Sequence, residues 1–242
     1  MQNRYAGDIG DFGKLGLLRM LQSEGLSVGV NWYLTPDESH NSDGRYVQYL
    51  RKNSYRDCDD SLWDALKVIV ESGDRSVFSL QESGILEAAY YSELLDFSGK
   101  TKSERDAVRH KWHRKALNAL SAADVVFADP DNGLLVPSAV GTTKENKFVK
   151  LEELRDYYRQ GSSVVYYQHK ARRPDAFYTE QHRRLLQRFG AEDSLGFGLK
   201  FVTTSQRYYF FIMQPEHMTQ IKEAANLLQN SPWKGHFLFI AL

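Results

Sequence analysis

The sequence predicts a single α/β domain over residues 1–242, with a doubly wound, mostly parallel sheet, helices on both faces and a C-terminal antiparallel hairpin. Strand-like and helical apolar periods alternate along most of the chain, which is typical of this Rossmann-like class. Two late β-rich runs, 198–204 and 208–214, are separated by only three residues. No crossover helix fits there, so the two runs should pair antiparallel. A length of 242 residues with 42% hydrophobic composition suits one sizeable core.

The same hydrophobic periodicity predicts the individual helices and strands in order along the chain. An apolar stripe predicts a first helix over 12–24, ending at Gly25, and the run 27–34 predicts the first strand. Further helices are expected over 45–52, 59–71, 84–95, 102–120, 147–160, 174–189 and 216–229, and strands over 76–80, 124–128, 162–168, 198–204 and 208–214. The tail 235–242 is aromatic and apolar, so we expect it to be buried or paired.

Composition narrows the class of protein without naming a partner. Lys plus Arg equals Asp plus Glu at 31 each, so net charge neither favours nor excludes nucleic acid. The single cysteine, Cys58, excludes an intramolecular disulfide and a multi-cysteine metal site within these residues. No window approaches the roughly 18 to 20 apolar residues of a membrane-spanning helix. A cytoplasmic protein with no membrane segment is expected.

The most informative segment is Asp129-Pro130-Asp131-Asn132, which directly follows the strand expected at 124–128. In open α/β sheets, ligands bind at the carboxyl ends of strands. Pro130 restricts the backbone, so the two carboxylates and the amide form a stiff polar rim that can hold a metal, a ribose or an exocyclic amine. The alternative is a loop that only needs turn residues. Asp129 is expected to lie outside the core, so Asp129→Asn should abolish activity with little effect on stability.

Three further polar groups are candidates for the same edge of the sheet. His169 ends the strand at 162–168 and can act as a general base or a structural histidine. The cations after it, Lys170 and Arg172, can engage phosphate. The N-terminal segment is dense in Gly, Asp and cations, and it either contributes to substrate binding or only caps the first helix. Its candidate residues are Asn3, Arg4, Tyr5, Asp8, Asp11 and Lys14.

The order of these features resembles a known arrangement. A helix before the first strand, a polar loop after it, an Asp-Pro motif after a mid-chain strand and a closing antiparallel hairpin are similar to class I S-adenosylmethionine-dependent methyltransferases. More narrowly, the chain resembles the helix-first bacterial rRNA adenine-N6 methyltransferases over 12–214. In the family's catalytic Asp-Pro-Pro-aromatic tetrapeptide, Asp129 and Pro130 match, whereas Asp131 and Asn132 depart. The first strand is also not followed by the family's Gly-x-Gly.

The resemblance implies a nucleic-acid-directed transferase that uses S-adenosylmethionine. The candidate catalytic residues are Asp129, Asp131, Asn132 and His169. Asp129 and Asn132 would bind the acceptor group, and His169 would assist. The loop after the first strand would hold the cofactor, with Asp37 or Asp43 near the ribose. The candidate cofactor residues are Asp37, His40, Asn41, Asp43 and Arg45.

Two other functions remain open at the sequence level. One is a metal-dependent phosphodiesterase or nuclease, with Mg²⁺ or Mn²⁺ bound by Asp129, Asp131 and His169. The other is a non-catalytic binding module that keeps the fold without the chemistry. The oligomeric state is left open by the sequence.

Overall fold

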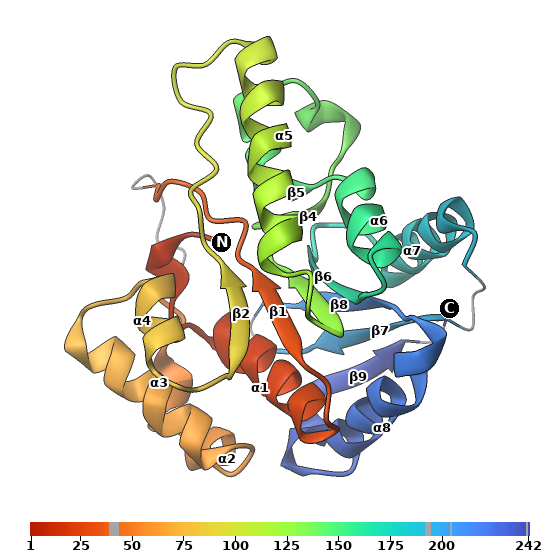
Figure 1. Cartoon of the computed structure of the whole chain (residues 1–242). Helices are drawn as coiled ribbons and strands as arrows, with labels where there is room; N and C mark the ends of the chain where they lie inside the picture. The colour runs from red at the N-terminus through yellow and green to blue at the C-terminus, as the bar shows by residue number, and fades with distance from the viewer. Residues whose placement is uncertain (39–43, 192–194, 204, 241) are drawn as a thin grey trace.

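The computed structural model describes residues 1–38, 44–191, 195–203, 205–240 and 242. Its centre is a seven-stranded sheet in the order β2-β1-β3-β6-β8-β7-β9 (Figure 1). The strands are β1 Val28–Asn31, β2 Ala88–Tyr91, β3 Val125–Ala128, β6 Ser163–His169, β7 Gly196–Phe201, β8 Arg207–Ile212 and β9 Phe237–Ile240. The pairs β2-β1, β1-β3 and β3-β6 are parallel, and β8, β7 and β9 pair antiparallel with their neighbours. The predicted mostly parallel α/β sheet is confirmed.

Helices cover both faces of this sheet, and each face has its own hydrophobic core (Figure 1). The helices of the first core are α1 Ile9–Ser23, α3 Asp60–Ser72, α4 Val77–Glu82 and α8 Met218–Gln229, with the short α2 Asn53–Arg56 beside them. The helices of the second core are α5 Lys102–Ala119, α6 Leu151–Arg159 and α7 Asp175–Phe189. In β3 the alternation is direct: Phe127 belongs to the first core and Val126 to the second.

Local sequence explains where α1 and α5 begin. The side chain of Asp8 accepts hydrogen bonds from the backbone N–H groups of Gly10 and Asp11, at 2.7 and 3.2 Å, and so starts α1. Thr101 and Glu104 form a capping box at the start of α5. Strand β3, Val-Val-Phe-Ala, is buried at every position, as a central parallel strand should be.

The predicted antiparallel hairpin is confirmed. β7 and β8 pair from Gly196↔Ile212 to Phe201↔Arg207, and β8 lies between β7 and β6. The tail also pairs, because β9 joins β7 at the edge of the sheet. Phe237 is buried, as expected, but Phe239 is 54% exposed because an edge strand has less cover.

Residues 76–95 are where the predicted elements are wrong. The expected strand at 76–80 is the helix α4, because the Ser76 hydroxyl accepts from Ser79 N–H at 3.0 Å and caps it. The expected helix at 84–95 contains β2, Ala-Ala-Tyr-Tyr, which is strand only because it pairs with β1.

Two further segments differ from the prediction. The expected helix at 45–52 is reduced to a 3₁₀ turn, Gln48–Arg51. A small parallel pair, β4 Gly133–Leu134 and β5 Phe148–Val149, was not predicted.

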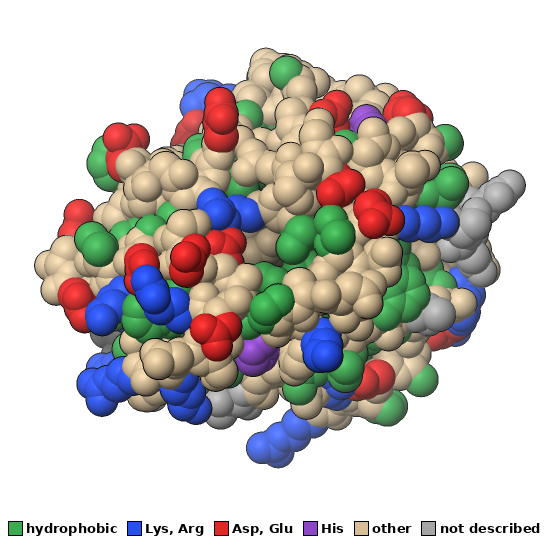
Figure 2. All heavy atoms as spheres, turned by 90° about the horizontal axis from the view of Figure 1, so that it is seen from below, with side chains coloured by type: hydrophobic (Ala, Val, Ile, Leu, Met, Phe, Trp, Pro, Cys, Tyr) green, Lys and Arg blue, Asp and Glu red, His purple; other side chains and the backbone are tan. Residues whose placement is uncertain are grey.

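The surface seen from below carries acidic and basic side chains interspersed with apolar ones (Figure 2). This mixture agrees with the formal net charge of zero and gives that face no uniform field. In the part of the chain that the structure describes, we find no helix with the length and apolar character needed to cross a membrane.

Candidate functional site

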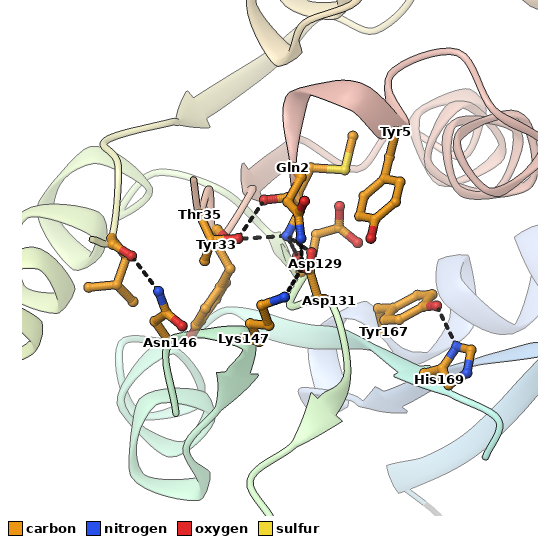
Figure 3. Close-up of polar contacts among 12 residues, drawn as sticks. Gln2, Tyr5, Tyr33, Thr35, Asp129, Asp131, Asn146, Lys147, Tyr167 and His169 are labelled. Carbon is orange, nitrogen blue, oxygen red and sulfur yellow. Dashed lines mark hydrogen bonds and ion pairs between the residues drawn. The ribbon is translucent and has the colours of Figure 1, made fainter. Parts of the chain in front are cut away.

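A pocket of about 420 Å³ opens at the carboxyl ends of β3 and β6, beside the first turns of α1. It collects side chains from segments far apart in the sequence, and Figure 3 shows part of it. The described residues that line it are Met1, Tyr5, Asp8, Gly10, Asp11, Lys14, Glu38, Gly44, Tyr46, Asp129, Pro130, Asp131, Asn132, Lys147, Tyr167, His169, Ser205 and Arg207. The topology places this pocket at the edge where open α/β sheets bind ligands.

A buried charge cluster joins α1 to the end of β3. Lys14 Nζ lies 2.7 Å from Asp11 Oδ1 and 2.5 Å from Asp129 Oδ2, and it also sits 5.1 Å from the centre of the Trp32 ring. Burial alone would lower the pKa of Lys14, but the charges of Asp11 and Asp129 outweigh it and raise that pKa. Lys14 is therefore a fixed cation and not a general base.

Asp129 lies inside the protein, so the expectation that it sits outside the core is wrong: its exposed fraction is 4%. Replacing it with Asn would weaken a buried ion pair, and a stability cost is therefore expected along with any loss of activity. Lys14 occupies Oδ2 of Asp129. Within the described part of the chain Oδ1 accepts no hydrogen bond, which leaves it as an acceptor facing the pocket.

Asp131 faces a second ammonium group. The nitrogen of Met1 lies 2.7 Å from Asp131 Oδ1 and donates to the carbonyls of Tyr33 and Asp129 at 3.1 and 3.0 Å. Gln2 donates to Asp131 Oδ2 at 2.8 Å (Figure 3). Burial raises the pKa of Asp131, but the Met1 ammonium and the Gln2 hydrogen bond outweigh it, so the pKa falls below its usual range.

The loop between these carboxylates and β4 is fixed by one buried amide. Gln168 Oε1 accepts from Leu134 N–H at 3.0 Å, and its Nε2 donates to the Asn132 carbonyl at 3.1 Å. Gly133 has a φ of +104°, and a β-carbon there would run into the Gln168 side chain. Gln168 therefore sets the position of Asn132 at the pocket wall.

Asp8 and Arg207 form the opposite wall. Burial, and to a smaller extent the charge of Asp11, raises the pKa of Asp8 to about 6. The charges of Arg207 and Lys14 oppose this shift. Arg207 is 6% exposed and lies across the start of α1, where it would collide with a β-carbon at Gly10. Its guanidinium donates to the Ser205 hydroxyl. Asp8 thus both caps α1 and titrates within the pocket.

Aromatic rings complete the lining. Tyr5, Tyr46 and Tyr167 all border the pocket, and Tyr167 contacts His169 Nδ1 through its hydroxyl at 3.4 Å (Figure 3). His169 is exposed at the rim. It stands opposite Arg207 in the β6–β8 ladder.

The structure brings most of the residues predicted for catalysis and substrate binding to this pocket. Those that line it are Asp129, Asp131, Asn132, His169, Tyr5, Asp8, Asp11 and Lys14. Asn3 lies outside it and instead accepts from Val77 N–H at 3.0 Å, and Arg4 donates to the Glu38 carbonyl at 2.5 Å. Lys170 pairs with Asp175 at 3.1 Å, and Arg172 is exposed.

The predicted cofactor residues are less well gathered. Asp37 is exposed and accepts from Arg4 N–H at 3.3 Å, and Arg45 is exposed outside the pocket lining. His40, Asn41 and Asp43 lie outside the described residues.

Several lining residues were not predicted from the sequence. Lys147 reaches Glu38 at 2.5 Å and Asp131 at 4.0 Å, and Arg207 lies at the start of an aromatic strand. A charged first residue in an otherwise apolar and aromatic strand is the sequence signal that would have indicated Arg207. Nothing in the local sequence distinguishes Lys147 or Tyr167.

The alternative metal centre at Asp129, Asp131 and His169 stays a prediction. No three His, Cys, Asp or Glu side chains in the described part of the chain are arranged to hold a metal ion. The reason is visible at β3: Lys14 binds Asp129, and the Met1 ammonium binds Asp131. Asp129, Asp131 and His169 are therefore not a ready ligand set for Mg²⁺ or Mn²⁺.

Comparison with known proteins supports the fold. No family model matches the chain, and no match was found among the curated proteins. Among solved structures, the chain is similar to protein LPL1258 from Legionella pneumophila, assigned to the family DUF519, with a TM-score of 0.51 and 13% identity over 97% of each chain. At that identity the likeness shows a shared α/β fold, and the methyltransferase resemblance stays a prediction.

Proposed function

We propose that the chain is a nucleic-acid-directed transferase that takes an extruded base into this pocket and uses S-adenosylmethionine as donor. One observation carries the proposal. The Asp129-Pro130-Asp131-Asn132 segment, the start of α1 and the carboxyl end of β6 converge on one pocket of about 420 Å³. That volume lies within the range of about 300 to 1,000 Å³ for small-molecule sites.

The acceptors between β1 and β3 fit the ammonium group of S-adenosylmethionine. The carbonyls of Tyr33 and Asp129 and the carboxylate of Asp131 converge on a single ammonium nitrogen, that of Met1. An amino-acid ammonium has three donors and needs such a set of acceptors. The cofactor would bind there only with Met1 displaced, and it would supply the methyl group. Asp37 remains the described candidate for its ribose.

Other residues that line the pocket suit an adenine-like acceptor. Asp129 Oδ1 can accept from an exocyclic amine, while Lys14 holds the carboxylate in place through Oδ2. The Asn132 amide can donate and accept at the edge of a base. The rings of Tyr5, Tyr46 and Tyr167 offer flat surfaces for stacking. His169, at the rim of the pocket, would take up the proton that the acceptor amine loses on methyl transfer.

The test measures binding and turnover on the same variants. S-adenosylmethionine or S-adenosylhomocysteine should raise the unfolding midpoint of the wild type, and labelled methyl groups should appear in single-stranded DNA or RNA. Asp129→Asn should lower transfer by about 10²-fold or more. Asp64→Asn, at an exposed position of α3, is the matched control. A midpoint that neither compound raises, together with no transfer, would refute the proposal.

A second function has one observation in its favour. Both carboxylates of the motif already have a partner within the chain, Lys14 for Asp129 and the Met1 nitrogen for Asp131. A non-catalytic binding module would need no more than this. This alternative predicts that the chain binds nucleic acid, that the methyl donor does not raise the unfolding midpoint, and that no methyl group is transferred. The same measurements distinguish it from the transferase.

A further inference from the structure

An exposed surface begins where the pocket ends. It is formed by Lys170, Arg172, Arg173 and Phe177, which we call the 170–177 surface. His169 lines the pocket, and residues 171–177 that follow it are all exposed. The Lys170 backbone N–H donates to the Gln206 carbonyl at 3.4 Å, which anchors this segment beside β8.

The surface carries an excess of positive charge. Asp175 is its one described carboxylate, and it is engaged by Lys200 at 2.6 Å, by Lys170 at 3.1 Å and by the Tyr208 hydroxyl at 2.7 Å. Arg172 and Arg173 form no ion pair with any described residue. Lys170 and Lys200 thus share the one carboxylate. The two arginines are the cations left for a polyanion.

An aromatic ring lies within this basic surface. Phe177 is 46% exposed at the start of α7, and the Arg173 guanidinium carbon lies 5.5 Å from the centre of its ring. The centres of the Phe177 and Tyr178 rings lie 5.3 Å apart with an interplanar angle of 89°, and this edge-to-face contact limits the freedom of the Phe177 ring. An exposed ring beside an arginine is a typical platform for an unpaired base.

We propose that the 170–177 surface binds the single-stranded nucleic acid that flanks the base held in the pocket. A neighbouring base stacks on Phe177, and Arg172 and Arg173 contact the adjoining phosphates. A duplex hides the faces of its bases, so the stacking contact selects an unpaired strand. This inference rests on the proposed function, because it names how that function's polymer substrate is held.

The experiment measures the affinity of a fluorescently labelled single-stranded oligonucleotide, as DNA and as RNA, between 50 and 200 mM salt. Phe177→Ala should weaken binding about 5- to 140-fold, the usual effect of losing one stacked base. Arg172→Ala/Arg173→Ala should reduce the slope of log affinity against log salt by about 1.4, or about 0.7 for each lost phosphate contact.

Matched controls remove the same groups elsewhere. Phe78→Ala removes a 64% exposed ring from α4, and Lys111→Ala/Arg114→Ala removes two cations from a groove on α5. Both should bind as the wild type does. The effect then belongs to the 170–177 surface and not to total charge or aromatic content.

The outcomes separate this inference from the proposed function. If the wild type binds the oligonucleotide and the surface variants bind equally well, the surface is not the docking site, while the transferase proposal stands. If the wild type binds neither DNA nor RNA, the inference and the nucleic-acid substrate both fail. A preference for duplex that Phe177→Ala leaves unchanged would also overturn the inference.

Discussion

Lys14→Met is the substitution that tests the architecture of the site most directly. Lys14 Nζ is 2.7 Å from Asp11 and 2.5 Å from Asp129, and all three side chains are buried. Methionine keeps most of the volume but leaves two carboxylates without their cation. Removing one partner of a buried pair costs about 3–5 kcal/mol. For a chain of 242 residues, that corresponds to a midpoint about 6–20 °C lower.

The cost should depend on pH in a defined direction. Burial already raises the pKa of Asp129 although Lys14 opposes that shift, so removing Lys14 raises the folded-state pKa of Asp129 further above its ordinary value. The folded variant then binds more protons than the unfolded chain, so its stability falls as pH rises between these two values. The difference from the wild type should therefore be larger at pH 7 than at pH 5.

Denaturant unfolding at the two pH values measures this difference. Lys67→Met is the control, because its ion pair with Glu71, at 3.8 Å, is exposed and should contribute about 0–1 kcal/mol. A cost for Lys14→Met below about 1 kcal/mol at pH 7, or one that is no smaller at pH 5, would refute the reasoning.

Two further substitutions test the titrating cap and the second core. Asp8 has a pKa of about 6 in the fold against 3.8 as its ordinary value, so wild-type stability should fall as pH rises from about 4 to 6. Asp8→Asn keeps the cap on α1. Between pH 4 and 7, the free energy of unfolding of this variant should rise by about 1–3 kcal/mol relative to the wild type, as measured by chemical denaturation. Unfolding free energies of variant and wild type that run parallel with pH would contradict the assignment. Arg109 makes a bidentate buried pair with Glu153 at 2.6 and 2.8 Å, so Arg109→Met should cost about 3–5 kcal/mol in the same assay. Ligand binding in the pocket should survive that change at temperatures where the variant is folded, and its selective loss would place Arg109 in the site.

The sequence predicted the sheet best where local signals agree with the long-range pairing. Only five residues, 202–206, separate β7 from β8, which is too few for a crossover helix, so the hairpin follows from chain length alone. The failure at 76–95 has the opposite cause. Ala88–Tyr91 has little strand character of its own beyond two tyrosines, and it becomes β2 because β1 offers an open edge. An edge pairing of this kind depends on where the rest of the chain has folded.

The candidate site was predicted in outline and not in its contacts. Asp129 follows a strand and Lys14 lies in a helix, and each position is readable from its neighbours. Their contact spans 115 residues and depends on how α1 crosses the sheet, which no local pattern records. The resulting pair changes what Asp129 can do, because one of its oxygens belongs to Lys14. The burial of Asp129 follows from the same packing.

Charge separates the two parts of the proposed binding mode. The pocket holds nearly balanced charges, with five carboxylates at Asp8, Asp11, Glu38, Asp129 and Asp131 and four cations at Lys14, Lys147, Arg207 and the Met1 nitrogen. Fixed pairs of this kind attract neither sign of ion strongly, so a ligand must enter through shape, stacking and hydrogen bonds. The 170–177 surface has unmatched arginines in contact with solvent, where counterions compete. Added salt should therefore weaken oligonucleotide binding steeply and change methyl-donor binding little. The polymer is held through its phosphate charges, whereas the reacting groups are held through shape, stacking and hydrogen bonds.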